Sequence, residues 1–151
     1  MSLHTATVVW ERGQQTFTDN RYSRVHAWRF DGGMTVTAAA SPHIVRVPYT
    51  DPRAVDPEEA FVVSIASCHM LWFLTIAAKR GFLVDSYRDE VIGKMDKNDE
   101  GKMAIVKVTL RPQIQFAGDR LPTAEQIHEM HRKAHEECFI ANSVKCPIVW
   151  E

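Results

Sequence analysis

Short runs of apolar and β-branched residues, separated by turn-forming residues, predict strands in the first 40 positions of the chain. The predicted strands are Thr5–Trp10, Val25–Phe30 and Met34–Ala38. The second and third strands form a hairpin around the turn at Asp31-Gly-Gly. Residues 41–55 contain three prolines and are therefore expected to form an irregular but ordered loop.

A long stretch without formal charge, residues 60–78, predicts a helix over residues 56–80. Asp56 can cap this helix, Pro57 suits its first turn, and Gly81 suits the position after its end. The stretch approaches the roughly 20 apolar residues that span a bilayer, but polar residues interrupt it and acidic residues precede it. A membrane span is therefore not expected. A lone chain of 151 residues can hardly bury so apolar a helix on every side, which suggests a dimer.

The second half of the chain predicts two extended runs, a helix and a closing strand. Residues 84–95 and 103–116 form a long hairpin around a glycine-containing turn. The helix is capped by Thr123, with Gln126 at the capping-box position, and is expected to continue to about Ala141. Residues 146–150 form the closing strand. The order β-β-β-α-β-β-α-β is typical of an α+β fold, and the absence of linker-like sequence predicts a single domain over residues 1–151.

Composition and charge exclude several classes of partner. Lysine and arginine total 18 against 19 aspartate and glutamate, for a formal charge of −1. This balance argues against a nucleic-acid-binding surface and against a polybasic membrane patch. The first residues have neither the basic start nor the apolar run of a signal peptide. Three cysteines are too few for a disulfide framework and suggest a reducing compartment, so a cytoplasmic location is expected.

The second predicted helix presents four residues of metal-ligand type on one face, within an arc of about 80°: His128, His131, His135 and Cys138. His128 and Cys138 lie roughly 15 Å apart along the axis, so one ion could bind only a neighbouring pair with ligands from elsewhere. A solvated or half-buried histidine face is the favoured interpretation, and no metal or other bound cofactor is expected. CxxC, HExxH and glycine-rich phosphate motifs are absent.

Cys68 lies in the middle of the apolar helix, where a buried and unreactive thiol is the ordinary outcome. A reactive thiolate at this position requires a nearby cation, for which Arg21 and Arg24 are candidates. Exposed surface charge is the alternative role for both arginines. Cys138 can meet Cys68 only if the two helices cross at that point.

Two segments resemble the OsmC/Ohr family of osmotically inducible and organic hydroperoxide resistance proteins. Residues 56–68 resemble its helix start, in which Pro-Glu-Glu precedes a cysteine, and residues 134–143 resemble its second-cysteine segment. The order of elements also matches over nearly the whole chain. The resemblance implies an intertwined homodimer, with two long helices at the centre and antiparallel sheets outside, and a thiol peroxidase site.

Carried over residue by residue, the resemblance makes Cys68 the peroxidatic cysteine and Cys138 the resolving one. Glu58 matches the acidic residue that holds the active-site arginine, for which Arg24 is the choice and Arg21 the alternate. Three features depart from the family pattern. Phe139 follows the second cysteine where proline is frequent, the proline-rich loop at residues 41–55 is an addition, and Cys146 has no assigned counterpart.

The leading hypothesis is therefore an enzyme that reduces organic, including fatty-acid-type, hydroperoxides. Cys68 would form a sulfenic acid and then a disulfide with Cys138, which an external thiol or dithiol reduces. Glu58 and Cys68 are about 15 Å apart on a straight helix, which favours a site built from both chains of a dimer. Four apolar residues offer either a substrate wall or core packing: Phe61, Met70, Trp72 and Phe73. The alternatives are a non-enzymatic dimer that binds an apolar small molecule and a thiol redox sensor.

Overall fold

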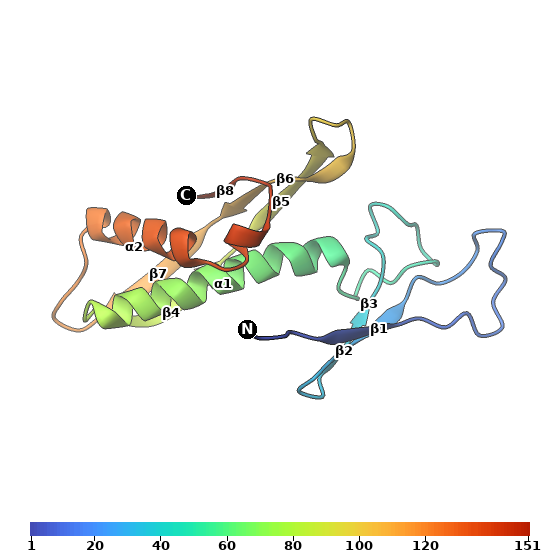
Figure 1. Cartoon of the computed structure of the whole chain (residues 1–151), viewed down its shortest axis with the longest axis horizontal. Coiled ribbons are helices and arrows are strands. Elements are labelled where there is room, and N and C mark those ends of the chain that lie inside the picture. Colours follow the sequence, from blue (N-terminus) through green and yellow to red (C-terminus); the bar gives the residue numbers. More distant parts are fainter. The chain divides into compact units, whose positions relative to one another are not determined.

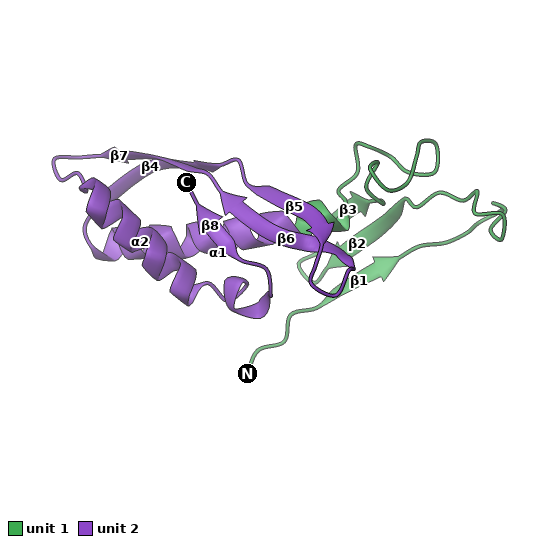
Figure 2. Ribbon diagram, turned by 90° about the horizontal axis from the view of Figure 1, so that it is seen from above, with its two compact units in different colours: residues 1–60 green, residues 61–151 purple.

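The computed structural model describes all residues from 1 to 151 and divides into two compact units, which Figure 2 colours separately. Unit 1 comprises residues 1–60 and unit 2 residues 61–151. Each unit is described by itself below. The single-domain expectation stays a prediction, because one domain can contain two such units.

Unit 1 contains one antiparallel sheet of three strands in the order β1-β2-β3. The strands are β1 (Ala6–Val9), β2 (His26–Phe30) and β3 (Thr35–Ala38). They confirm the three predicted strands to within one or two residues at each end. The loop over residues 41–55 is irregular, as expected, and returns to the sheet at its end, where Ala39 N–H donates to the carbonyl of Val55.

The long helix α1 (Pro57–Lys79) begins and ends where the sequence predicts. At its start Glu59 N–H donates to Asp56 Oδ1 (2.8 Å), and Asp56 N–H donates to Glu59 Oε2 (3.1 Å), so the two residues form a capping box. At its end Gly81 takes φ +78°, and the N–H of Phe82 reaches back to the carbonyl of Ala77. This is a Schellman motif, which requires a left-handed residue at the glycine position.

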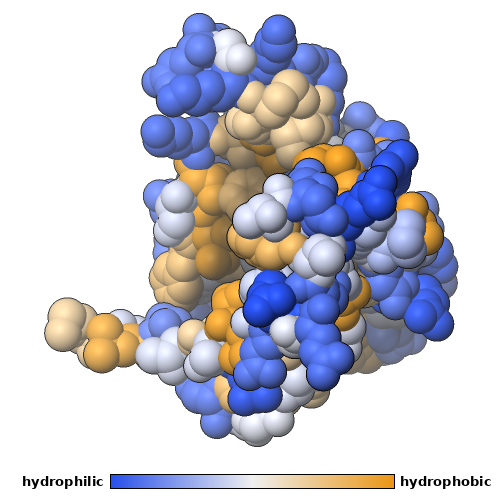
Figure 3. All heavy atoms as spheres, turned by 90° about the vertical axis from the view of Figure 1, so that its right-hand side faces the viewer, coloured by the Kyte–Doolittle hydropathy of each residue, from blue (hydrophilic) through white to orange (hydrophobic).

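Helix α1 is long and apolar enough to cross a membrane by length and composition, yet the same properties describe the central helix of a soluble fold. Only 28% of its most apolar stretch is buried within this chain. Val63 and Leu71 on this helix are 56% and 58% exposed. Apolar residues also reach the surface among polar ones on the face that Figure 3 shows.

The strands of unit 2 form two small sheets. β4 (Leu83–Asp89) pairs with β7 (Pro112–Ala117), and β6 (Met103–Leu110) lies between β5 (Ile92–Lys97) and β8 (Ile148–Trp150). The predicted long hairpin is present, but each of its runs is interrupted once. Arg111 N–H donates to the Asp89 side chain (2.7 Å) instead of to a neighbouring strand, and the following proline has no N–H to donate.

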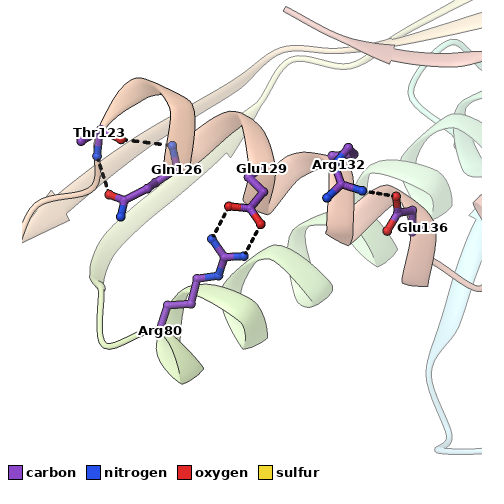
Figure 4. A network of polar contacts seen from close by, with 6 residues as sticks. All are labelled: Arg80, Thr123, Gln126, Glu129, Arg132 and Glu136. Atoms are coloured by element: carbon purple, nitrogen blue, oxygen red, sulfur yellow. Dashed lines mark hydrogen bonds and ion pairs between the residues drawn. The ribbon is translucent and has the colours of Figure 1, made fainter.

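Helix α2 (Ala124–Glu137) begins with the predicted capping box and lies alongside α1 (Figure 1). The expected end at Ala141 is wrong, because Cys138 leaves the helix with ψ 112° and becomes its C-cap. Figure 4 shows the capping box and the bidentate ion pair between Arg80 and Glu129 (3.0 and 3.1 Å), which joins the end of α1 to α2. A short 3₁₀ turn follows at Ala141–Ser143.

Two clusters of apolar residues form the core of unit 2, and α1 contributes to both. The first cluster contains Ile65, Ala66, Val108, Leu110 and Ile148. The second contains Phe73, Ala77, Phe82, Met130 and Ala134. The second cluster fixes α2 against α1, and so fixes the position of Cys138, at the end of α2, relative to α1.

Gly93 on β5 allows the strand to lie close to α1. A Cβ at this position would clash with Cγ2 of Val62, whose branched side chain has little rotamer freedom. We therefore expect Gly93→Ala to lower the free energy of unfolding by about 1–3 kcal/mol, because the added methyl group overpacks the contact. Denaturant unfolding measures the loss. The double variant Gly93→Ala/Val62→Ala should cost less than the sum of the two single variants, and strict additivity would contradict the proposed clash.

Candidate functional site

Cys68 and Cys138, which lie 70 positions apart in the sequence, are neighbours in unit 2. Cys68 lies on the middle of α1 and is half-buried, whereas Cys138 lies at the end of α2 with no exposed surface. Both thiols are free. The Cys138 Sγ accepts a hydrogen bond from the N–H of Ala141 (3.3 Å). Burial, followed by the adjacent thiol of Cys68, raises the pKa of Cys138 to about 11.

The different environments suit the two thiols to different chemical roles. A thiol with a pKa near 11 is protonated at neutral pH and is a poor first nucleophile. Cys68 is the more accessible of the two, so it is the thiol that an incoming molecule can reach. Cys138 lies beside it and is shielded from solvent, and this proximity lets its sulfur condense with a Cys68 sulfur that has been oxidised.

Unit 1 contains both candidate arginines. The Arg24 guanidinium lies over the ring of Tyr22, with its central carbon 3.8 Å from the ring centroid. It also donates to the carbonyl and the side-chain oxygen of Asn20 (3.1 and 2.6 Å). Arg21 is exposed, and only its backbone N–H is engaged, by the Asp19 side chain (3.0 Å). Arg24 is thus the preorganised cation of the two. Its assignment to Cys68, which lies in unit 2, stays a prediction.

Glu58 lies in the first turn of α1, as the sequence indicates. Its Oε2 atom is buried and has no hydrogen-bond partner in this chain. A carboxylate oxygen without a partner is costly to bury, so this atom is suited to receive a donor such as a guanidinium. The pairing of Glu58 with an arginine stays a prediction.

An apolar cavity of about 470 Å³ lies beside Arg24 in unit 1. Its wall includes an aromatic cluster in which Trp10, Phe17 and Tyr22 contact one another at centroid distances of 4.6 to 5.8 Å. The hydrogen bond from Trp10 Nε1 to the Ser23 carbonyl (2.8 Å) fixes the cluster. The sequence analysis did not identify this cavity, since three aromatic residues spread over 13 positions show no periodic signal.

The histidine face of α2 packs around one tryptophan. The ring of Trp150 lies 5.8 to 6.1 Å, centroid to centroid, from the rings of four histidines: His69, His128, His131 and His135. This arrangement agrees with a half-buried histidine face. No three histidine, cysteine, aspartate or glutamate side chains converge in a geometry that could hold a metal ion. Trp150 and His69 were missed by the sequence analysis, because neither belongs to the stripe on α2.

Of the four apolar residues expected to form either a substrate wall or the core, two pack in the core. Phe73 has no exposed surface and belongs to the second core cluster, so core packing explains it. Phe61 packs against the first cluster. Trp72 lies edge-on against Phe139, with the ring centroids 5.6 Å apart, and Phe139 is 69% exposed. Cys146 packs against the first cluster, and burial raises the pKa of its thiol.

Comparison with known proteins gives the chain its family. The family model described as OsmC-like protein matches residues 50–151. An OsmC-like protein of unknown function from Vibrio cholerae is 54% identical, with 100% of this chain and 99% of that chain covered and a TM-score of 0.98. A comparison with curated proteins found no match.

More distant structures share the fold. The organic hydroperoxide resistance protein OhrB of Bacillus subtilis is 20% identical, with 99% of this chain and 98% of that chain covered and a TM-score of 0.69. An organic hydroperoxide resistance protein from Elizabethkingia anophelis is 13% identical, with coverages of 100% and 96% and a TM-score of 0.72. From the family model and the close relative together, the chain belongs to the OsmC-like family.

Proposed function

We propose that this protein is a cysteine-based thiol peroxidase that reduces organic hydroperoxides. The observation that supports this most directly is the pairing of an accessible thiol, Cys68, with a buried neighbouring thiol, Cys138. Fold relatives named as organic hydroperoxide resistance proteins support the same chemistry. A cytoplasmic location fits a working dithiol, because cellular reductants there regenerate free thiols.

The proposed reaction has three steps. The Cys68 thiolate attacks one oxygen of the hydroperoxide, the O–O bond breaks, and the alcohol leaves after it gains a proton, while Cys68 becomes a sulfenic acid. The Cys138 sulfur then attacks the Cys68 sulfur, forming the disulfide and releasing water. An external dithiol reduces the disulfide by thiol–disulfide exchange and is itself oxidised. No bound cofactor takes part.

The roles of Arg24 and Glu58 follow from charge. A guanidinium beside Cys68 would stabilise the thiolate and donate hydrogen bonds to the peroxide oxygens, and a carboxylate would fix its orientation. The unpartnered Oε2 of Glu58 supports this role for the carboxylate. The apolar cavity beside Arg24 supports an organic substrate over hydrogen peroxide, since only an organic peroxide has an apolar group to bury.

We propose further that the active form is a homodimer. The exposed Val63 and Leu71 on α1 support this, because a long apolar helix gains stability when a second copy covers it. The estimated 15 Å between Glu58 and Cys68 on a straight helix favours a site that takes residues from both chains.

The dimer proposal is tested by Leu71→Asp. We expect this variant to weaken dimerisation at least about tenfold, because a charge would be buried without a partner, and to lose activity in parallel. Sedimentation and peroxidase assays at matched concentrations measure both effects. Lys102→Asp, in the exposed turn between β5 and β6, is the control and should change neither. A monomeric Leu71→Asp protein with full activity would contradict the proposal.

The proposed activity is tested by consumption of cumene hydroperoxide and of hydrogen peroxide by the wild-type protein with dithiothreitol as reductant. We expect steady turnover of both, with cumene hydroperoxide preferred by at least about tenfold in kcat/KM, because its ring can enter an apolar cavity. No turnover of either peroxide, with the thiols left reduced, would contradict the proposed function.

A further inference from the structure

Unit 2 contains a second cavity, of about 360 Å³, which the proposed peroxidase chemistry does not use. Its volume falls in the range of small-molecule sites, roughly 300–1,000 Å³. No cysteine lines it. Its walls consist mainly of flat or branched apolar surface and two histidine rings, from Ile114, Phe116, Ile127, His128, His131 and Trp150.

His131 contributes one of the polar groups in the wall of this cavity. His131 Nδ1 is engaged by His69 Nε2 at 3.0 Å, in a pair whose rings stack at an angle of 10°. His131 Nε2 has no hydrogen-bond partner and is not among the fully buried unpartnered atoms, so it keeps some exposed surface on a residue that lines the cavity. His69 Nδ1, at the other end of the pair, is buried and unpartnered.

The hydrogen bond between the two histidines determines what His131 offers. Burial, together with the other histidines, lowers the pKa of His69 to about 3, and burial lowers that of His131 to about 4, so both rings are neutral at pH 7. An orphaned buried N–H is rarer than an under-used acceptor, which places the lone pair on His69 Nδ1 and the proton on its Nε2. His69 then donates to His131 Nδ1, which leaves His131 Nε2–H as a free donor for a ligand in the cavity.

We propose that this cavity binds a neutral, planar aromatic molecule whose carbonyl oxygen accepts a hydrogen bond from His131 Nε2–H. The flat rings of Trp150 and Phe116 suit an aromatic body. The carboxylate of Glu151 also lines the cavity and is joined to Arg111 through a 3.4 Å contact at the surface. This negative charge disfavours a carboxylate ligand.

The proposal is tested with acetophenone as the probe and ethylbenzene as the same body without the acceptor. Binding to the full chain is followed by NMR through the indole resonance of Trp150. His131→Phe should weaken acetophenone binding about five- to tenfold, the effect of one hydrogen bond, and leave ethylbenzene binding unchanged. Benzoate should bind the wild-type protein more weakly than acetophenone, because its charge meets Glu151.

A second variant tests the location without removing a buried residue. Ala124 lies at the exposed start of α2 and lines the cavity, so Ala124→Leu should fill it and weaken both probes at least about tenfold. Lys133→Leu adds the same side chain to an exposed position of the same helix and should have no effect. Cys68→Ser should also bind both probes normally, so failure of the peroxidase proposal would leave this one standing.

Each outcome decides the proposal. If His131→Phe does not fold, the ¹⁵N chemical shift of His131 Nε2 is measured in the wild-type protein instead. This shift should change when acetophenone is added but not when ethylbenzene is added. Absence of binding to the wild-type protein would overturn the proposal, and would favour a second copy of the chain as the occupant of this space. Binding that Ala124→Leu does not weaken, or equal losses of both probes in His131→Phe, would overturn it as well.

Discussion

Cys68→Ser is expected to lower the turnover of cumene hydroperoxide by roughly three orders of magnitude or more, since no other accessible thiol lies beside a resolving partner. A serine hydroxyl does not ionise near neutral pH and cannot become a sulfenic acid. The substitution exchanges one small half-buried side chain for another, so the melting temperature should change little. The assay compares the variant and the wild-type protein with dithiothreitol as reductant.

Cys138→Ser should separate the two half-reactions. The first equivalent of peroxide should still be consumed, because Cys68 remains, but the product should be a sulfenic acid that a second peroxide oxidises to a sulfinic acid. Mass spectrometry distinguishes these products by their added oxygen atoms. Cys146→Ser is the matched control and should retain full turnover, since Cys146 is a free thiol that has no part in the proposed chemistry. Equal losses in all three variants would contradict the assigned roles.

A strong pH dependence of stability is the second large effect expected. The folded-state pKa values of His69 and His131 are lowered to about 3 and about 4, against about 6.5 in the unfolded chain. Between these values the unfolded chain binds more protons than the folded one, so the free energy of unfolding falls as the pH falls. This contribution is intact above about pH 6.5. The loss between pH 7 and pH 5 should be about 4 kcal/mol for the pair.

Denaturant unfolding between pH 5 and pH 8, at one protein concentration and ionic strength, measures this dependence. The double variant His69→Phe/His131→Phe removes both titrating groups and keeps an aromatic ring at each position. We expect its stability to vary much less over the same range. A wild-type protein equally stable at pH 5 and pH 7, or a variant with the same slope, would show that the two histidines do not titrate as described.

Local sequence signals predicted the elements of this fold well where a few neighbouring residues determine the structure. The cap at Asp56, the capping box at Thr123 and the glycine after α1 were all predicted from the sequence and are all present. The end of α2 was not predicted. Cys138 turns out of the helix, where its sulfur accepts the Ala141 N–H and the Asn142 side chain donates to the Glu136 carbonyl, and no glycine marks that position.

The candidate site was predicted only in part, for a physical reason. That Cys68 and Cys138 are neighbours depends on the crossing of two helices, so periodicity alone left it open and the resemblance to a family supplied it. The environment of Trp150 was missed altogether. Its histidine contacts come from two helices, while the tryptophan itself lies on the last strand, and no spacing rule relates such distant positions.

The most direct test of the central claim is a single-turnover reaction analysed by peptide mapping. The reduced wild-type protein is mixed with one equivalent of cumene hydroperoxide, quenched with an alkylating agent at low pH, and digested. The account predicts one new disulfide, between Cys68 and Cys138, with Cys146 alkylated and one equivalent of the alcohol formed. Fully alkylated thiols after the peroxide has been supplied, or a disulfide that includes Cys146, would contradict it.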